Sequence, residues 1–105
     1  MILCFGCKAH FDKEKWLKHP DRTDSKNPRF DMVDDLCKNI IVKGKTNALE
    51  IVKLLGKPWQ VDTLKTSIEY QYPIGSNSGF HIDPYSLVIE FDKDNLVVDT
   101  RLIKH

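Results

Sequence analysis

The spacing of hydrophobic residues changes along the chain, from a helical period of about 3.6 before Trp59 to alternation after it. The clearest helical stretch is "NALEIVKLLGKP" (47–58), whose apolar stripe at i, i+3, i+4 and i+7 consists of Ala48, Ile51, Val52 and Leu55. Asn47 is a suitable N-cap, and Glu50 three residues later completes a capping box. Gly56 favours a helix end, and the proline that follows prevents continuation. We therefore predict a helix between Asn47 and Gly56.

A second helical pattern precedes this one. Asn27 can cap it, Pro28 suits its first position, and Asp31 lies in the first turn, where the helix dipole favours an anion. Its apolar face consists of Val33, Leu36 and Ile40, flanked by Met32 and Cys37. The segment "VKGK" (42–45) then interrupts the pattern. We predict a second amphipathic helix that ends before this segment.

Beyond residue 59 the apolar residues alternate, which is typical of strands with one buried face. Two such segments are "TSIEYQYPI" (66–74) and "SLVIEFD" (86–92), and the β-branched, apolar segment "LVVDTRLI" (96–103) is the last predicted strand. The last two are joined by a tight hairpin, "DKDN", in which Asn95 can adopt a positive φ. The order of elements predicts an α+β fold, with two helices packed on one face of a three-stranded antiparallel meander sheet.

The N-terminal part is polar, and we predict that residues 1–26 form a leader or tether and residues 27–105 the folded domain. The segment "HPDRTDSKNP" (19–28) contains two prolines and several turn-forming residues. Within residues 8–28, Phe11 and Trp16 are the large aromatic residues. We interpret them as anchors that pin the segment across a hydrophobic surface. An exposed stripe for partner binding is the alternative.

The composition is that of one globular domain, with 105 residues, 41% hydrophobic and 30% charged. Sixteen Lys and Arg against 15 Asp and Glu give a formal net charge of +1, which gives no electrostatic signal for nucleic acid. No apolar run approaches the ~20 residues of a membrane-spanning helix. The core needs most of the large apolar residues, so little remains for a ligand cavity. We expect no nucleic-acid partner and no small-molecule substrate.

The odd number of cysteines, namely Cys4, Cys7 and Cys37, disfavours a fully paired disulfide framework. These residues and His10 are candidate zinc ligands, but a second pair of closely spaced ligands is missing. We therefore expect no metal site. A cytosolic metal or redox protein that uses these cysteines is an alternative that stays open.

No set of residues combines a nucleophile, a base and an acid at a recognisable spacing. His81 and Asp83 lie near Ser76 and Ser78 in the loop between the first two predicted strands. However, no G-x-S-x-G nucleophile turn is present. We expect no enzymatic activity and no cofactor.

Four segments together resemble the SmpA/OmlA, or BamE-like, family of small bacterial outer-membrane lipoproteins. They are "FDKEKW" (11–16), "RFDMVDDL" (29–36), "NALEIVKLLGKP" (47–58) and "SLVIEFDKDNLV" (86–97). The resemblance implies two helices on a three-stranded antiparallel sheet, an arrangement that also occurs in the β-lactamase inhibitory protein. It further implies export, an N-terminal lipid anchor and a non-catalytic role in binding envelope proteins.

The first residues, "MILCFGCK", place Gly6 before Cys7 with apolar residues upstream, which resembles a lipobox with a lipidated cysteine. We therefore expect lipidation at Cys7 and a periplasmic location anchored to the outer membrane, or a cytoplasmic one if no upstream signal exists. The expected function is a non-enzymatic scaffold or protein-interaction module of the cell envelope. Its expected partners are envelope proteins.

Two surfaces are candidates for partner binding. One is the loop at 73–85, with Phe80, Asp83 and Tyr85 as contact residues. The other is the sheet face opposite to the helices, which bears Glu69, Gln71, Val88 and Glu90. An alternative function is that of an inhibitor-like domain that blocks an enzyme through the 73–85 loop.

Overall fold

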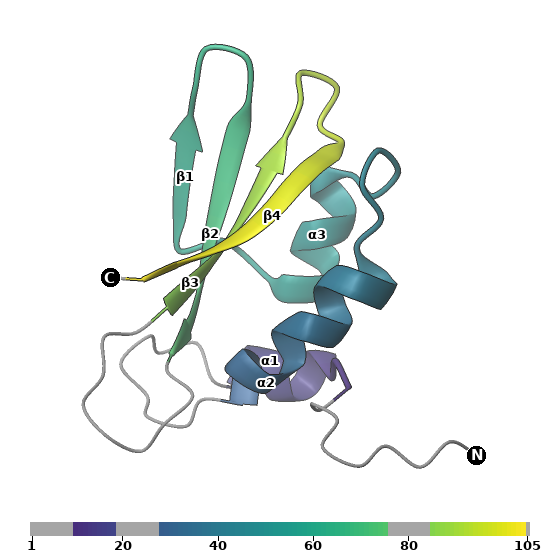
Figure 1. Cartoon of the computed structure of the whole chain (residues 1–105), viewed down its shortest axis with the longest axis vertical. Coiled ribbons are helices and arrows are strands. Elements are labelled where there is room, and N and C mark those ends of the chain that lie inside the picture. The colour runs from purple at the N-terminus through teal and green to yellow at the C-terminus, as the bar shows by residue number, and fades with distance from the viewer. Residues whose placement is uncertain (1–9, 19–27, 76–84, 105) are drawn as a thin grey trace.

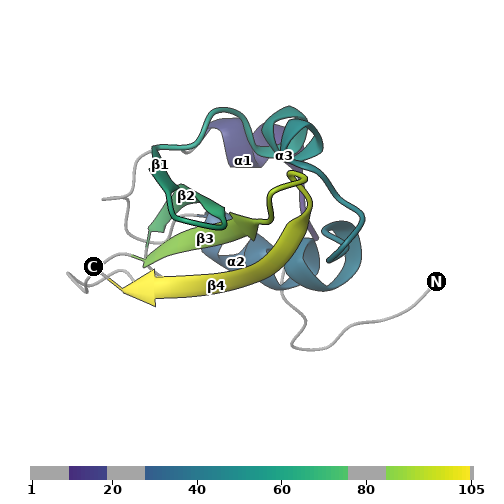
Figure 2. The same ribbon diagram turned by 90° about the horizontal axis from the view of Figure 1, so that it is seen from above.

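The computed structural model describes residues 10–18, 28–75 and 85–104, and it is an α+β fold. Helices gather on one side of a twisted antiparallel sheet with the strand order β1-β2-β3-β4 (Figures 1 and 2). The helical elements are α1 (Lys13–Lys18), α2 (Pro28–Asp35), the π-helical turn η1 (Leu36–Ile40) and α3 (Ala48–Leu55). The strands are β1 (Gln60–Thr63), β2 (Ile68–Gly75), β3 (Tyr85–Phe91) and β4 (Val97–Lys104). None of the helices in these ranges is long and apolar enough to cross a membrane.

The class and the antiparallel sheet are confirmed, but the predicted number of elements was too small. The strand β1 was missed because its sequence, "QVDT", contains one apolar residue, Val61, whose side chain is half exposed. The helix α1 was missed because six residues are too few for a helical period to be visible. Both elements are held by tertiary packing, which a local pattern does not report.

The predicted caps of α3 are confirmed. The Asn47 side chain accepts a hydrogen bond from the Glu50 N–H at 2.8 Å, and the Glu50 carboxylate accepts one from the Asn47 N–H at 3.2 Å. Gly56 ends the helix with a φ of 83°. Asn95 has a φ of 63°, as the hairpin sequence predicts. These two positive φ values fix where the chain turns, before β1 and before β4.

The helix that follows Pro28 is interrupted by a wider turn. From Leu36 the chain forms one π-helical turn, closed by a hydrogen bond from the Ile41 N–H to the Leu36 carbonyl at 2.9 Å. The predicted apolar face is largely buried, because Met32, Val33 and Leu36 are at most 8% exposed. The wider turn leaves Cys37 half-buried beside the sheet instead of in the centre of the core.

The core lies between the helices and the sheet, and it includes Trp16 of α1, which is fully buried. The indole Nε1 of Trp16 donates a hydrogen bond to the Leu55 carbonyl at the end of α3, at 3.2 Å. Phe11 packs against the indole, with ring centroids 6.0 Å apart. The interpretation of these two aromatic residues as anchors is therefore confirmed. Part of the segment that was predicted to be a tether is helical and contributes to the core.

Candidate functional site: the outer face of the sheet

The sheet face opposite to the helices carries one carboxylate on each strand, in a single row. Antiparallel register places the residues directly opposite one another across β1 to β4, and they are Asp62, Glu69, Glu90 and Asp99. We call these four residues the acidic row. Like charges directly opposite on neighbouring strands destabilise a sheet. The row therefore needs counter-groups that offset this repulsion.

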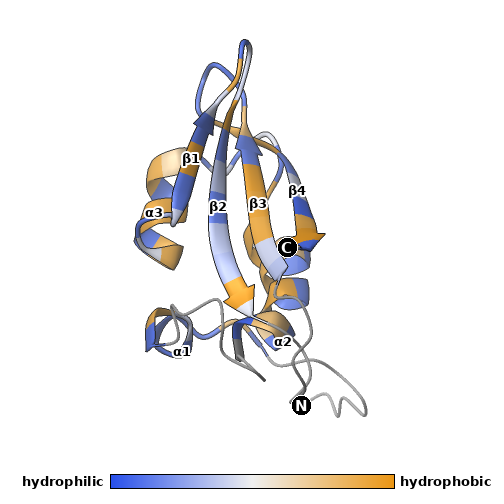
Figure 3. Cartoon of the chain, turned by 90° about the vertical axis from the view of Figure 1, so that its left-hand side faces the viewer, coloured by the Kyte–Doolittle hydropathy of each residue, from blue (hydrophilic) through white to orange (hydrophobic). Residues whose placement is uncertain are grey.

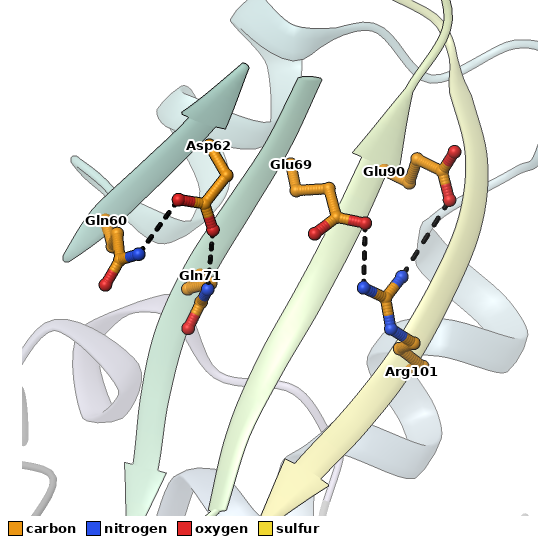
Figure 4. Close-up of polar contacts among 6 residues, drawn as sticks. All are labelled: Gln60, Asp62, Glu69, Gln71, Glu90 and Arg101. Atoms are coloured by element: carbon orange, nitrogen blue, oxygen red, sulfur yellow. Dashed lines mark hydrogen bonds and ion pairs between the residues drawn. The ribbon is translucent and has the colours of Figure 1, made fainter. Parts of the chain in front are cut away.

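Arg101 of β4 is the main counter-group (Figure 4). Its Nη2 lies 2.7 Å from an Oε2 of Glu69, and its Nη1 lies 3.8 Å from an Oε1 of Glu90. The hydrogen bond to Glu69 is the largest cause that raises the pKa of Arg101 above its ordinary value. At the end of the row, the Lys43 Nζ lies 3.4 Å from an Oδ1 of Asp99. Two cations thus contact three of the four carboxylates.

The fourth carboxylate, Asp62, is held by neutral groups. The Gln60 Nε2 donates to its Oδ1 at 2.9 Å, and the Gln71 Nε2 donates to its Oδ2 at 2.8 Å (Figure 4). Amide donors fix the position of a carboxylate without cancelling its charge. The β1 end of the acidic row therefore stays negative.

The face predicted from the sequence exists, but two of its four residues are buried and the other two are only partly exposed. Glu69, Gln71, Val88 and Glu90 do share the outer face. However, Val88 is 1% exposed and Gln71 is 8% exposed. Val88 lies between Gln71 and Arg101 on the two neighbouring strands, so long polar side chains flank it. Figure 3 shows this side of the sheet, with no helix in front of it. The solvent meets a charged surface there.

The other predicted surface, the 73–85 loop, is described only at its ends. Phe80 and Asp83 lie outside the described residues, as does Cys7. Tyr85 is half-buried, and its ring meets the ring of Phe30 edge-on with centroids 5.5 Å apart. Tyr85 therefore packs toward the helices and belongs to the margin of the core.

A pocket that the sequence analysis missed lies between the helices and β4. Its volume is about 250 Å³, and its lining residues are Phe30, Val33, Asp34, Cys37, Leu87, Thr100, Arg101 and Leu102. Burial raises the pKa of the Cys37 thiol, and a hydrogen bond with Thr100 acts in the opposite direction. These residues come from segments more than forty positions apart. No local motif indicates such a site.

Metal-ligating residues do not come together in the part of the chain that the structure describes. In residues 10–18, 28–75 and 85–104, no group of three or more His, Cys, Asp or Glu could hold a metal ion. The acidic row is consistent with this, because its side chains are spread over four strands and bonded to Arg101, Lys43 and two amides.

Comparison with known proteins returned no match: no family model, no curated protein and no solved structure is significantly similar to this chain. The resemblance to the SmpA/OmlA family therefore rests on the four sequence segments alone. It stays a hypothesis.

Proposed function

We propose that this protein is a non-catalytic interaction module whose outer sheet face binds a basic segment of another protein. The observation that carries the proposal is the acidic row, which spans all four strands and contacts only two cations among the described residues. Complementary charge directs association and excludes wrong partners. An ordered network on a rigid sheet also binds with little loss of side-chain freedom.

The Asp62 end of the row is the proposed centre of binding. Its carboxylate oxygens are oriented by Gln60 and Gln71, and a partner Lys or Arg would add the cation that the amides do not supply. At the other end, Arg101 and Lys43 already offset the charges of their neighbours. A partner with one or two basic side chains fits this row, whose negative charge is offset at the β4 end and not at the β1 end.

The proposed location is the cell envelope, with a lipid anchor at Cys7, and this part rests on the family resemblance. Intact-mass and peptide-level mass spectrometry of the protein from its native cells provides the test. We expect a diacylglyceryl group on Cys7 and recovery with outer membranes. An unmodified Cys7 in a soluble fraction would contradict the location and leave the binding proposal standing.

Site-specific photo-crosslinking in native cells tests the binding face. A crosslinking amino acid replaces Gln60, which is exposed on β1, and in a matched control it replaces Lys53, which is exposed on α3. We expect a discrete adduct with another protein from position 60 and none from position 53. Adducts from the helical side only would assign recognition to the other face.

Charge reversal at the centre of the site then separates recognition of charge from mere proximity. Asp62→Lys, combined with the crosslinker at position 60, should reduce the adduct about tenfold, because it places a cation opposite the partner's basic segment. Asp94→Lys at the exposed hairpin tip makes the same change of net charge and should leave the adduct unchanged. Equal yields from both variants would refute a basic partner at the acidic row.

A further inference from the structure

We propose that the outer edge of β4, with the pocket beside it, binds an extended segment of a partner protein as a fifth, antiparallel strand. The segment carries an apolar residue opposite Leu102 and an acidic residue opposite Lys104. This site uses the backbone edge of the sheet and its helical side. It is therefore independent of the outer face and of the function proposed above.

The edge of β4 already forms backbone hydrogen bonds with the 43–46 turn at its first residue. The Val97 N–H donates to the Thr46 carbonyl at 2.9 Å, and the Val97 carbonyl accepts from the Gly44 N–H at 2.7 Å. Among the described residues, no backbone hydrogen bond of this kind continues along 100–104. β4 is the last strand of the sheet, so its outward N–H and C=O groups form a template for another strand.

The pocket supplies a place for one side chain of that strand. Leu102 pairs with the buried Leu87, so its side chain lies on the helical side, yet it is 43% exposed. Leu102 lines the pocket, and the opposite wall consists of Phe30, Val33, Asp34 and Cys37. A residue paired with Leu102 lies on the same side of the sheet. An apolar side chain at that position would fill the pocket.

Charge indicates the chemistry of the partner segment. Lys104 is two residues from Leu102, so it shares the helical side, and it is exposed. None of the ion pairs that the structure describes involves it. Within 100–104 the chain has no acid, so a second copy that paired over these residues would offer Lys104 no carboxylate. An acidic foreign segment fits the edge better than a second copy does.

The direction of the partner follows from the sheet. Every strand pair here is antiparallel, and an antiparallel fifth strand would meet Lys104 first, Leu102 next and Thr100 last. Its sequence is therefore acidic, any residue, apolar, any residue, Ser or Thr. Main-chain hydrogen bonds would supply affinity, and the alternate side chains would supply specificity.

Alkylation of Cys37 reports directly on the pocket. The probe is a synthetic peptide of about nine residues with Glu, Leu and Thr at alternate positions, long enough for one strand. Site-resolved mass spectrometry follows alkylation of Cys37, while a trace of a short cysteine-containing reference peptide in the same sample corrects for reagent. We expect about tenfold slower alkylation of Cys37 at a peptide concentration of ten Kd. We also expect slowed hydrogen exchange of amides in 100–104.

Charge exchange across the new pair tests the register. Lys104→Glu should weaken binding of the Glu peptide about fivefold. A peptide with Lys in place of Glu should bind this variant about as tightly as the Glu peptide binds the wild type. Lys93→Glu, in the β3–β4 hairpin, is the matched control and should change neither affinity. Leu102→Asp should abolish binding, with far-ultraviolet circular dichroism confirming that each variant is folded.

Three outcomes would overturn the inference. The first is an unchanged rate of Cys37 alkylation at peptide concentrations up to about 5 mM, at which even weak binding of the peptide would be detected. The second is protection that Lys104→Glu does not reduce, because the charge argument then fails. The third is protection of Cys37 that rises with protein concentration without peptide, which would assign the edge to a second copy of the chain.

Discussion

Arg29 shows how one buried side chain joins three elements. It is 4% exposed, and it is the only charged residue among the buried side chains of the described chain. Its Nε donates to the Trp16 carbonyl of α1 and its Nη1 to the Pro73 carbonyl of β2, both at 2.7 Å. Its guanidinium lies 4.5 Å from the centroid of the Trp16 ring. Burial lowers the pKa of Arg29 to about 10, so it remains charged at neutral pH.

Replacing Arg29 with methionine should lower the free energy of unfolding by about 2–4 kcal/mol, because two buried carbonyls lose their donor. Urea unfolding followed by tryptophan fluorescence measures the change. Arg29→Lys keeps a positive charge but lacks the planar guanidinium with its several N–H donors. It should recover only part of the lost free energy of unfolding. A methionine variant as stable as the wild type would mean that the cost of burying the charge cancels these hydrogen bonds.

Asn47 is the N-cap of α3. Asn47→Ala removes the hydrogen bond that the Asn47 side chain accepts from the Glu50 N–H, and it should lower the free energy of unfolding by about 1 kcal/mol. Lys53→Ala, exposed on the same helix, leaves the cap intact and should stay within about 0.5 kcal/mol of the wild type. Equal effects of the two variants in urea unfolding would show that the cap contributes nothing specific.

At the scale of elements, α1 is held by contacts at its N-terminal end. Asp12 caps it, because its Oδ1 accepts from the Glu14 N–H at 3.0 Å. The residue before the cap is tied to α2, since the Phe11 N–H donates to an Oδ2 of Asp35 at 2.7 Å. Asn39 donates to the other oxygen of Asp35, also at 2.7 Å. The Asp35 carboxylate thus connects α1 to the junction of α2 and η1.

These hydrogen bonds, the one from the Phe11 N–H first, lower the pKa of Asp35 below its ordinary value of 3.8. As the pH falls, the unfolded chain therefore binds this proton before the folded chain does. The stabilisation is present above pH 3.8 and is lost as the pH falls through the folded pKa. Asp35→Asn should remove this part of the acid sensitivity, measured as unfolding free energy from pH 6 down to about pH 2.

Asp94→Asn serves as the control for Asp35→Asn. It removes one carboxyl at the hairpin tip, where Asp94 is exposed, and it should keep the full acid sensitivity of the wild type. If the free energy of unfolding of the two variants falls in parallel on acidification, the hydrogen bond from the Phe11 N–H to Asp35 does not form in solution.

The sequence predicts the long elements because their caps and periods are local. The capping box of α3, the alternation in β2 and β3 and the β-branched, apolar composition of β4 each require fewer than a dozen neighbouring residues. The short elements depend on distant partners. β1 pairs with β2 through a register that its four residues do not encode, and α1 is fixed by Trp16 meeting the end of α3. Tertiary contacts determine the secondary structure of such short segments.

At the scale of the whole molecule, the acidic row could be predicted only in part. A reader of the sequence sees Glu69 and Glu90 alternating with apolar residues, which places both on the outer face. Their alignment with Asp62 and Asp99 requires the register of three strand pairs. The bulge near Glu90 shifts the β3–β4 register by one residue, so counting from the hairpin alone misplaces Asp99. The pocket beside β4 depends on where the helical layer ends, which no single segment specifies.

The whole sheet should depend on Arg101 in a way that responds to salt. Arg101→Gln removes the cation between Glu69 and Glu90, so the four carboxylates repel across four strands. We expect the free energy of unfolding to fall by about 1 kcal/mol at low salt, and by much less near 1 M, where the Debye length is about 3 Å. Urea unfolding at the two salt concentrations gives the comparison. Lys57→Gln, outside the row, should have a small effect on the free energy of unfolding at both salt concentrations.

A loss of stability for Arg101→Gln that is the same at both salt concentrations would mean that Arg101 acts by covering Val88, because packing is insensitive to screening. The acidic row would then be a surface that the sheet tolerates without a counter-ion, which would also weaken the case that it needs a basic partner.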